Sequence, residues 1–189
     1  EQSEAARWWH TDTPSPALSK SSLGTFFFET ITAGGRIGMI WPFNPQFERS
    51  LVTVSVFMTE SMKDAIEAKT KFRFRKPPRI SLIQYDESRE DRYDDWKPSE
   101  DVLLRQKGAR WFHSDDHHSP SQSKAALGEF FYAVLRAGAQ IGTVYLFKSK
   151  WDPKGLVLTS VYMTEEMKQQ IEGKTRFRFR DPPSATIDD

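Results

Sequence analysis

The chain contains no cysteine. This absence excludes disulfide bonds, thiolate metal ligands and cysteine nucleophiles, and it leaves the redox compartment open. No apolar run approaches the roughly 20 residues that a membrane-spanning helix needs, so we expect no membrane association. The chain begins at Glu1 rather than methionine, which predicts a mature or trimmed N-terminus and leaves the compartment unknown.

Net charge is also small, at +1 over 189 residues, so the overall field favours no class of partner. The common catalytic signatures are missing: there is no glycine-rich phosphate loop, no dinucleotide fingerprint and no nucleophile elbow. Acidic residues are scattered, and no carboxylate pair stands out as a general acid and base. We therefore expect a protein that is not an enzyme and needs no cofactor.

Histidine and aspartate come together in two places, at His10 to Asp12 and at His113 to His118. Imidazole and carboxylate are suitable ligands for zinc and similar ions. The spacing is a very weak signal, and turns capped by Asp, Ser or Thr account for both segments. We therefore expect no metal site. A metal-dependent enzyme would need the two loops to converge.

The chain does contain a long internal repeat, present in two copies. R-W-W-H at 7–10 matches R-W-F-H at 110–113, and K-T-K-F-R-F-R-K-P-P at 69–78 matches K-T-R-F-R-F-R-D-P-P at 174–183. A period near a hundred residues is too long for a solenoid and indicates a duplicated domain. We predict a first repeat at 7–78, a linker at 79–109 and a second repeat at 110–183. Within the linker, 80–85 fits a short strand and 86–95 a charged loop.

Each repeat predicts a similar order of elements. Strands are expected at 7–10, 36–43, 51–57 and 69–75, with a helix capped by Thr59 before the last of them. Residues 23–32 and 127–136 are ambiguous. Leu127, Phe130, Phe131, Val134 and Leu135 fall at helical spacing, whereas F-F-F-E-T-I-T favours a strand. We predict a strand at both places and keep the helix as the alternative. The result is an α+β fold, a strand-rich unit with one helix duplicated about a pseudo-two-fold axis.

The repeated F-R-F-R segment alternates strictly. Its phenylalanines are therefore expected to face the core, and its cations to face outward. Same-face side chains on a strand lie about 6.6 Å apart, a spacing that suits an extended polyanion. The alternative is an edge strand protected from aggregation by its charges. The outward cations, and our first candidate nucleic-acid ligands, are Lys71, Arg73, Arg75, Arg176, Arg178 and Arg180.

Two adjacent aromatic residues follow Arg7, and two follow Arg110. Neighbours on a strand face opposite sides, so one ring of each pair is either exposed or covered by a second layer. An exposed ring beside an arginine is a platform for base stacking. We add Arg7, Trp8, Arg110 and Trp111 to the candidate site, the alternative being a strand buried on both faces. The same choice applies to Trp41, Phe47, Tyr145 and Trp151.

The segments S-V-F-M-T-E-S-M-K and S-V-Y-M-T-E-E-M-K, each followed by F-R-F-R and then K-P-P or D-P-P, resemble the strand, helix and aromatic strand of Whirly-type proteins. K-S-K-W-D-P-K-G at 148–155 resembles a turn of related coactivator-type domains. Whirly and Pur-type folds are built from two units of four strands and a helix. The plant Whirly motif is absent here, with S-K-A-A-L at 123–127 a partial echo. The resemblance implies binding of single-stranded DNA or RNA on strand faces, often by an oligomer.

These patterns predict a protein that binds single-stranded RNA or DNA through basic strand faces and neighbouring aromatic rings. Charge is distributed accordingly, because the repeats carry +4 and +3 while the linker carries −2. The alternative is a non-catalytic interaction or scaffold subunit whose exposed aromatic surface docks a protein partner or a second copy. Salt-sensitive binding of nucleic acid distinguishes the two.

Overall fold

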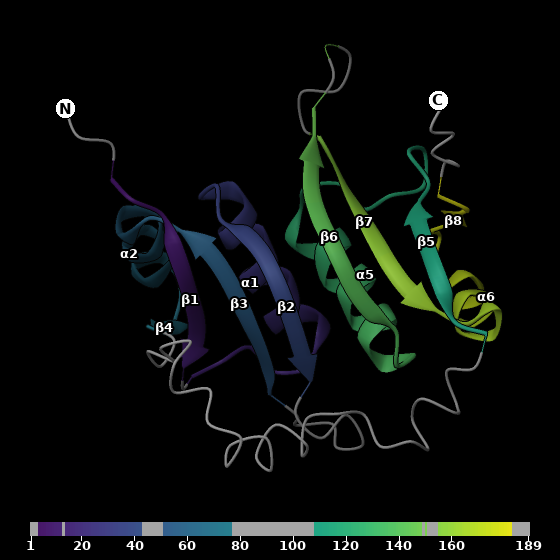
Figure 1. The fold of residues 1–189 in the computed structure, drawn as a ribbon, viewed down its shortest axis with the longest axis horizontal. Helices are drawn as coiled ribbons and strands as arrows, with labels where there is room; N and C mark the ends of the chain where they lie inside the picture. The colour runs from purple at the N-terminus through teal and green to yellow at the C-terminus, as the bar shows by residue number, and fades with distance from the viewer. Residues whose placement is uncertain are drawn as a thin grey trace, which may run out of the picture.

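The computed structural model describes residues 4–12, 14–42, 51–76, 108–148, 150 and 155–182. Each repeat has the order strand, helix, strand, strand, helix, strand (Figure 1). The first repeat contains β1 (Arg7–Asp12), α1 (Lys20–Thr32), β2 (Arg36–Pro42), β3 (Val52–Met58), α2 (Glu60–Lys69) and β4 (Arg73–Arg75). The second contains β5 (Arg110–Ser114), α5 (Lys124–Arg136), β6 (Gln140–Phe147), β7 (Leu156–Met163), α6 (Glu165–Lys174) and β8 (Phe179–Arg180).

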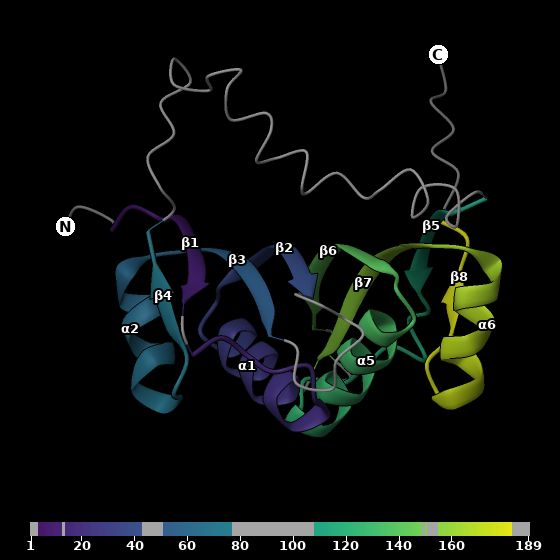
Figure 2. The same ribbon diagram turned by 90° about the horizontal axis from the view of Figure 1, so that it is seen from below.

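Each repeat forms its own antiparallel sheet. The strand orders are β2-β3-β1-β4 and β6-β7-β5-β8, with matching registers such as Trp8 opposite Phe57 and Trp111 opposite Tyr162. The helices lie on one side of the two sheets, and β2 and β6 lie side by side at the centre, running in opposite directions (Figures 1 and 2). The molecule is thus an α+β fold of two like units, as the sequence predicts.

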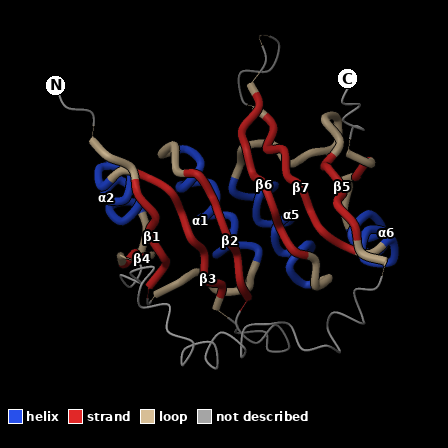
Figure 3. Tube along the Cα trace, in the orientation of Figure 1, coloured by secondary structure: helices blue, strands red, loops and turns tan. Residues whose placement is uncertain are grey.

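The strand predicted at 23–32 and 127–136 is wrong, because both segments are helical (Figure 3). Ser19 and Ser123 cap these helices, each accepting a hydrogen bond from the backbone N–H three residues on at 3.2 Å. Burial in the first copy recurs at Leu23, Phe26, Phe27 and Thr30, which is helical spacing. Packing of that face outweighs the β-propensity of the Phe and Thr residues. Each unit therefore contains two helices rather than one.

The two repeats join through α1 and α5, which cross beneath the seam between the sheets (Figure 2). The contacts are reciprocal: a Cβ added at Gly24 would overlap the Lys124 carbonyl oxygen, and one at Gly128 would overlap that of Lys20. The rings of Phe27 and Phe131 stack across the axis with centroids 3.8 Å apart. Reciprocal contacts of this kind are those of a two-fold interface, so the duplicated units pack as a pseudo-dimer.

Several predictions fall on parts of the chain that are outside the described residues. These are the strand at 80–85, the charged loop at 86–95, most of the turn at 148–155, and the rings of Trp41, Phe47 and Trp151.

The unit that the Whirly and Pur-type resemblance implies, four strands and then a helix, differs from the unit observed, in which a helix follows the first strand. Among the described helices, none is both long and apolar enough to cross a bilayer.

Candidate nucleic-acid interface

The face of each sheet opposite the helices, here called the outer face, is uncovered by any described helix (Figure 2). Alternation along β1 sends Trp9 and Thr11 into the core, so Trp8 and His10 lie on the outer face. The register adds Phe57 of β3 opposite Trp8, and Arg75 of β4 opposite His10.

The two repeated tryptophans are half exposed. Trp8 is 44% exposed beside Trp9 at 3%, and Trp111 is 45% exposed beside Phe112 at 1%. One ring of each pair is therefore in the core and the other on the outer face, the exposed alternative of the sequence prediction. Because the chain alternates, a single aromatic pair supplies both a core anchor and a surface ring.

A glycine two strands away, in β2 or β6, makes room for each exposed indole to reach across the intervening strand. A Cβ at Gly38 would be 2.5 Å from Cζ3 of Trp8, and Gly142 and Trp111 show the same distance. A bulge falls at this point of both β2 and β6. Ser55 and Ser160 satisfy the displaced backbone by accepting from the N–H of Met39 at 2.8 Å and of Thr143 at 2.7 Å. The far edge of each indole, at Cζ3 and Cη2, thus contacts the sheet, while the residue stays half exposed.

The phenylalanines of the F-R-F-R segments are buried, as predicted: Phe72, Phe74, Phe177 and Phe179 are 2%, 8%, 1% and 7% exposed. All six cations of these segments are exposed, as predicted, but they do not form continuous three-residue rows on a strand. Only Arg73–Arg75 and Phe179–Arg180 are strand, since the helix runs to Lys69 or Lys174.

Arg73 and Arg178 act on the preceding helix. Nη1 of Arg73 donates to the carbonyls of Glu67, Thr70 and Phe72 at 3.1, 3.1 and 2.7 Å. Arg178 makes the same three bonds in the second repeat. The last carbonyls of a helix have no partner within the helix, so each guanidinium caps a helix C-terminus. The repeated decapeptide is therefore a helix stop followed by an edge strand.

The other strand arginines lie on the outer face. Arg75 is opposite His10, and burial together with the Arg75 charge lowers the pKa of His10. Arg180 is opposite His113, and its Nη2 lies 3.1 Å from the Asp116 carboxylate. Arg75 has no such ion pair among the described residues, so the two repeats differ in how much positive charge they present.

Four predicted cations lie elsewhere. The Arg7 guanidinium lies 4.3 Å from the Trp9 ring centroid and 3.8 Å from the Glu60 carboxylate. The Arg110 guanidinium lies 4.2 Å from the Phe112 ring centroid and pairs with Glu165 and Asp181. Lys71 and Arg176 precede the edge strands, and Arg176 lies 5.9 Å from the Phe177 ring centroid. Of the ten predicted residues, the outer face brings together Trp8, Arg75, Trp111 and Arg180.

Sequence reasoning missed three outer-face residues. Arg36 starts β2 opposite Phe57, while Met39 of β2 and Phe147 of β6 are 55% and 51% exposed. Tyr145, for which the sequence left the choice open, is 50% exposed. The alternation of β2 and β6 carries this signal, but the bulge at Gly38 and Gly142 shifts its phase.

The two histidine segments do not converge. His10 lies in β1 and His113 in β5, so β3, β2, β6 and β7 stand between them. Within the described parts of the chain, no three His, Asp or Glu side chains gather as a metal site would require. No family model, curated protein or solved structure matches this chain.

Proposed function

We propose that the protein binds single-stranded RNA or DNA on its outer face, with bases stacked on Trp8 and Trp111. The observation that carries the proposal is the pair of half-exposed indoles, at equivalent positions of both repeats, lying against the sheet. A ring held at its far edge by the sheet loses little freedom when a base stacks on it.

Cations near the first tryptophan support phosphate binding. Arg36 lies two strands from Trp8, and Arg75 lies on the adjacent edge strand one outer-face position further along. Neither has an ion pair with a carboxylate in the described ranges. The second repeat has Gln140 opposite Tyr162 where the first has Arg36 opposite Phe57, and its Arg180 is paired with Asp116. The first repeat is therefore the stronger half of the site.

The test is fluorescence-anisotropy titration with mixed-sequence single-stranded RNA and DNA, at low and physiological salt. Loss of a stacked base costs about 1–3 kcal/mol, so Trp8→Ala weakens binding roughly 5- to 150-fold. The double variant Arg36→Gln/Arg75→Gln lowers the salt slope by about 1.4, or about 0.7 for each phosphate contact.

The matched control is Lys71→Gln/Arg176→Gln, which removes the same charge from outside the outer face and leaves binding close to wild type. No binding at low salt refutes the proposal. Equal losses in both double variants would mean that net charge alone drives binding, which also contradicts a stacking site.

A second candidate function is docking of a protein partner. Met39, Tyr145 and Phe147 are large exposed residues on the central strands. A groove of about 600 Å³ follows the seam between β2 and β6, lined by residues that include Ile37, Val144 and Tyr145. Binding through this surface would be insensitive to salt and to Arg75→Gln, and would be lost in Tyr145→Ala.

A further inference from the structure

One of the differences between the equivalent helices α1 and α5 removes a carboxylate. In the first repeat, Glu29 of α1 has a side chain that is 11% exposed, and its Oε1 lies 3.5 Å from Nζ of Lys124, the first residue of α5. By pseudo-symmetry Lys124 corresponds to Lys20, and Glu29 corresponds to Ala133. The second repeat therefore keeps the lysine and lacks the carboxylate.

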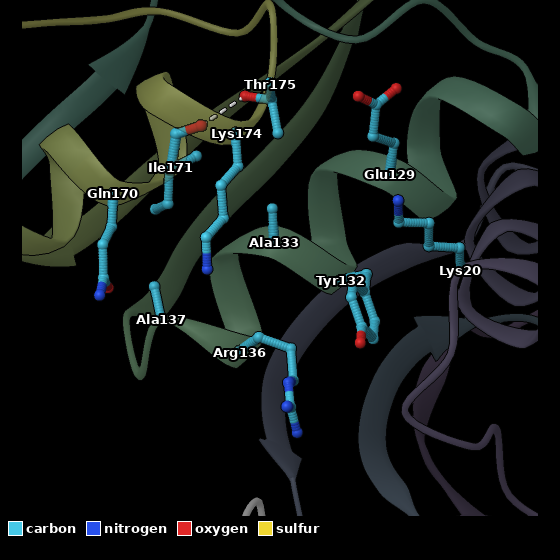
Figure 4. Close-up of a pocket in the computed structure, with 10 residues that line it drawn as sticks. All are labelled: Lys20, Glu129, Tyr132, Ala133, Arg136, Ala137, Gln170, Ile171, Lys174 and Thr175. Atoms are coloured by element: carbon cyan, nitrogen blue, oxygen red, sulfur yellow. Dashed lines mark hydrogen bonds between the residues drawn. The ribbon is translucent and has the colours of Figure 1, made fainter. Parts of the chain in front are cut away.

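A hollow of about 270 Å³ lies at Ala133, between α5 and α6 (Figure 4). Lys20 and Lys174 both line it, and in this view their side chains lie on opposite sides of Ala133. Neither lysine has an ion-pair partner among the described residues. Tyr132 forms part of the wall, with Lys20 Nζ 5.8 Å from its ring centroid.

The charge of this lining is positive. Arg136 adds a third cation where the first repeat has Thr32, and Glu129 is the one acid that lines the hollow. Ala133 and the ring of Tyr132 give it an apolar surface, with the buried Ile171 behind. A cation that has lost its carboxylate, beside a partly enclosed space, is a site for an external anion.

We propose that this hollow binds a small anionic molecule whose carboxylate or phosphate takes the position that the Glu29 carboxylate holds in the first repeat. Lys20 contacts the anion, Lys174 adds positive charge to the same lining, and the compact apolar body of the ligand rests on Ala133 and the Tyr132 ring. The volume lies just below the range of about 300–1,000 Å³ of pockets for drug-sized ligands, so the occupant is small. The hollow lies on the helix side of the molecule, opposite the outer face.

The experiment is a heteronuclear NMR titration of the full chain with inorganic phosphate and, separately, benzoate, at constant ionic strength in chloride. We expect saturable shifts centred on the backbone amides of 132–137 and 170–175. Ala133→Glu supplies the missing carboxylate internally and weakens binding by about tenfold or more. Lys20→Gln, an exposed change that leaves the fold intact, weakens it similarly.

The first repeat provides the converse test. Glu29→Ala/Thr32→Arg gives the first repeat the alanine and the arginine of that lining beside Lys124, so a second set of saturable shifts is expected near 28–33 and 65–70. Tighter binding of phosphate than of benzoate identifies a phosphoryl ligand, and the reverse identifies a carboxylate. Shifts that do not saturate, or that persist unchanged in both Ala133→Glu and Lys20→Gln, overturn the proposal. Its failure leaves the outer-face function untouched, because the two sites share no residue.

Discussion

Gly24 of α1 and Gly128 of α5 meet where the two helices cross, and a Cβ added at Gly24 would lie 3.2 Å from the Gly128 Cα. The same Cβ would overlap the backbone of Lys124, which cannot move away as a side chain can. Close approach of the helices brings the Phe27 and Phe131 rings into contact and holds both repeats around one core.

Gly24→Ala and Gly128→Ala should each therefore destabilise the protein, by about 2 kcal/mol or more, although alanine is the better helix former. Gly173→Ala is the matched control, since no atom lies within 4 Å of its added Cβ. It should stabilise the protein by about 0.5–1 kcal/mol. Urea denaturation measures all three, and a neutral Gly24→Ala would contradict the tight crossing.

Arg73→Ala should lower the free energy of unfolding by about 1–2 kcal/mol, because the carbonyls of Glu67 in the last turn of α2, of the cap residue Thr70 and of Phe72 lose a charged donor. Arg75→Ala, two residues on, should change it by less than about 0.5 kcal/mol. Thermal unfolding followed by circular dichroism compares the two. Equal effects would show that the guanidinium does not cap the helix.

Phe131→Ala should cost about 3–5 kcal/mol, because the ring is fully buried and stacks on Phe27 across the axis. Phe147→Ala is the control of equal chemistry at an exposed position, and we expect less than about 0.5 kcal/mol there. Each of the two variants should still unfold in a single transition, since the repeats share a core. Two separate transitions in the wild-type protein would be evidence against that shared core.

His10 should titrate below the ordinary histidine range, because burial and then the Arg75 charge oppose its protonation. In the unfolded chain His10 has its ordinary, higher pKa, so acidification protonates the unfolded state first. The stability that neutral His10 allows is therefore complete above that pKa, and it is lost as pH falls towards the lower pKa of His10 in the folded protein. NMR titration should show the pKa of His10 rising in Arg75→Gln. Denaturation at pH 7.5 and pH 5 should show that the free energy of unfolding falls less between these pH values for His10→Gln than for wild type.

The sequence predicts the duplication, the strands and the helix after Thr59 because these depend on local signals. Repetition, period-two alternation and an N-cap are each visible within a few residues. The first helix was missed for a non-local reason. The residues of α1 favour a strand locally, and the face that makes them a helix is defined by α5, about a hundred positions away.

The candidate site was predicted in part for a similar reason. Alternation places Phe72 and Phe74 in the core and Trp8 on the surface. It does not predict that Arg73 turns back to the end of α2, because a long side chain on a strand can reach carbonyls of a neighbouring element. Nor does it predict the bulge at Gly38, which sets which residues of β2 face outward.

Because both repeats belong to one chain, the two halves of their interface can acquire different substitutions. In a dimer of identical subunits every substitution appears twice, so a carboxylate at position 29 would fill both hollows or neither. A tandem chain removes that constraint, and Glu29 and Ala133 differ while the helix crossing around them stays matched. One half keeps the ion pair between Glu29 and Lys124, while in the other half the equivalent Lys20 is left for the anion that we propose.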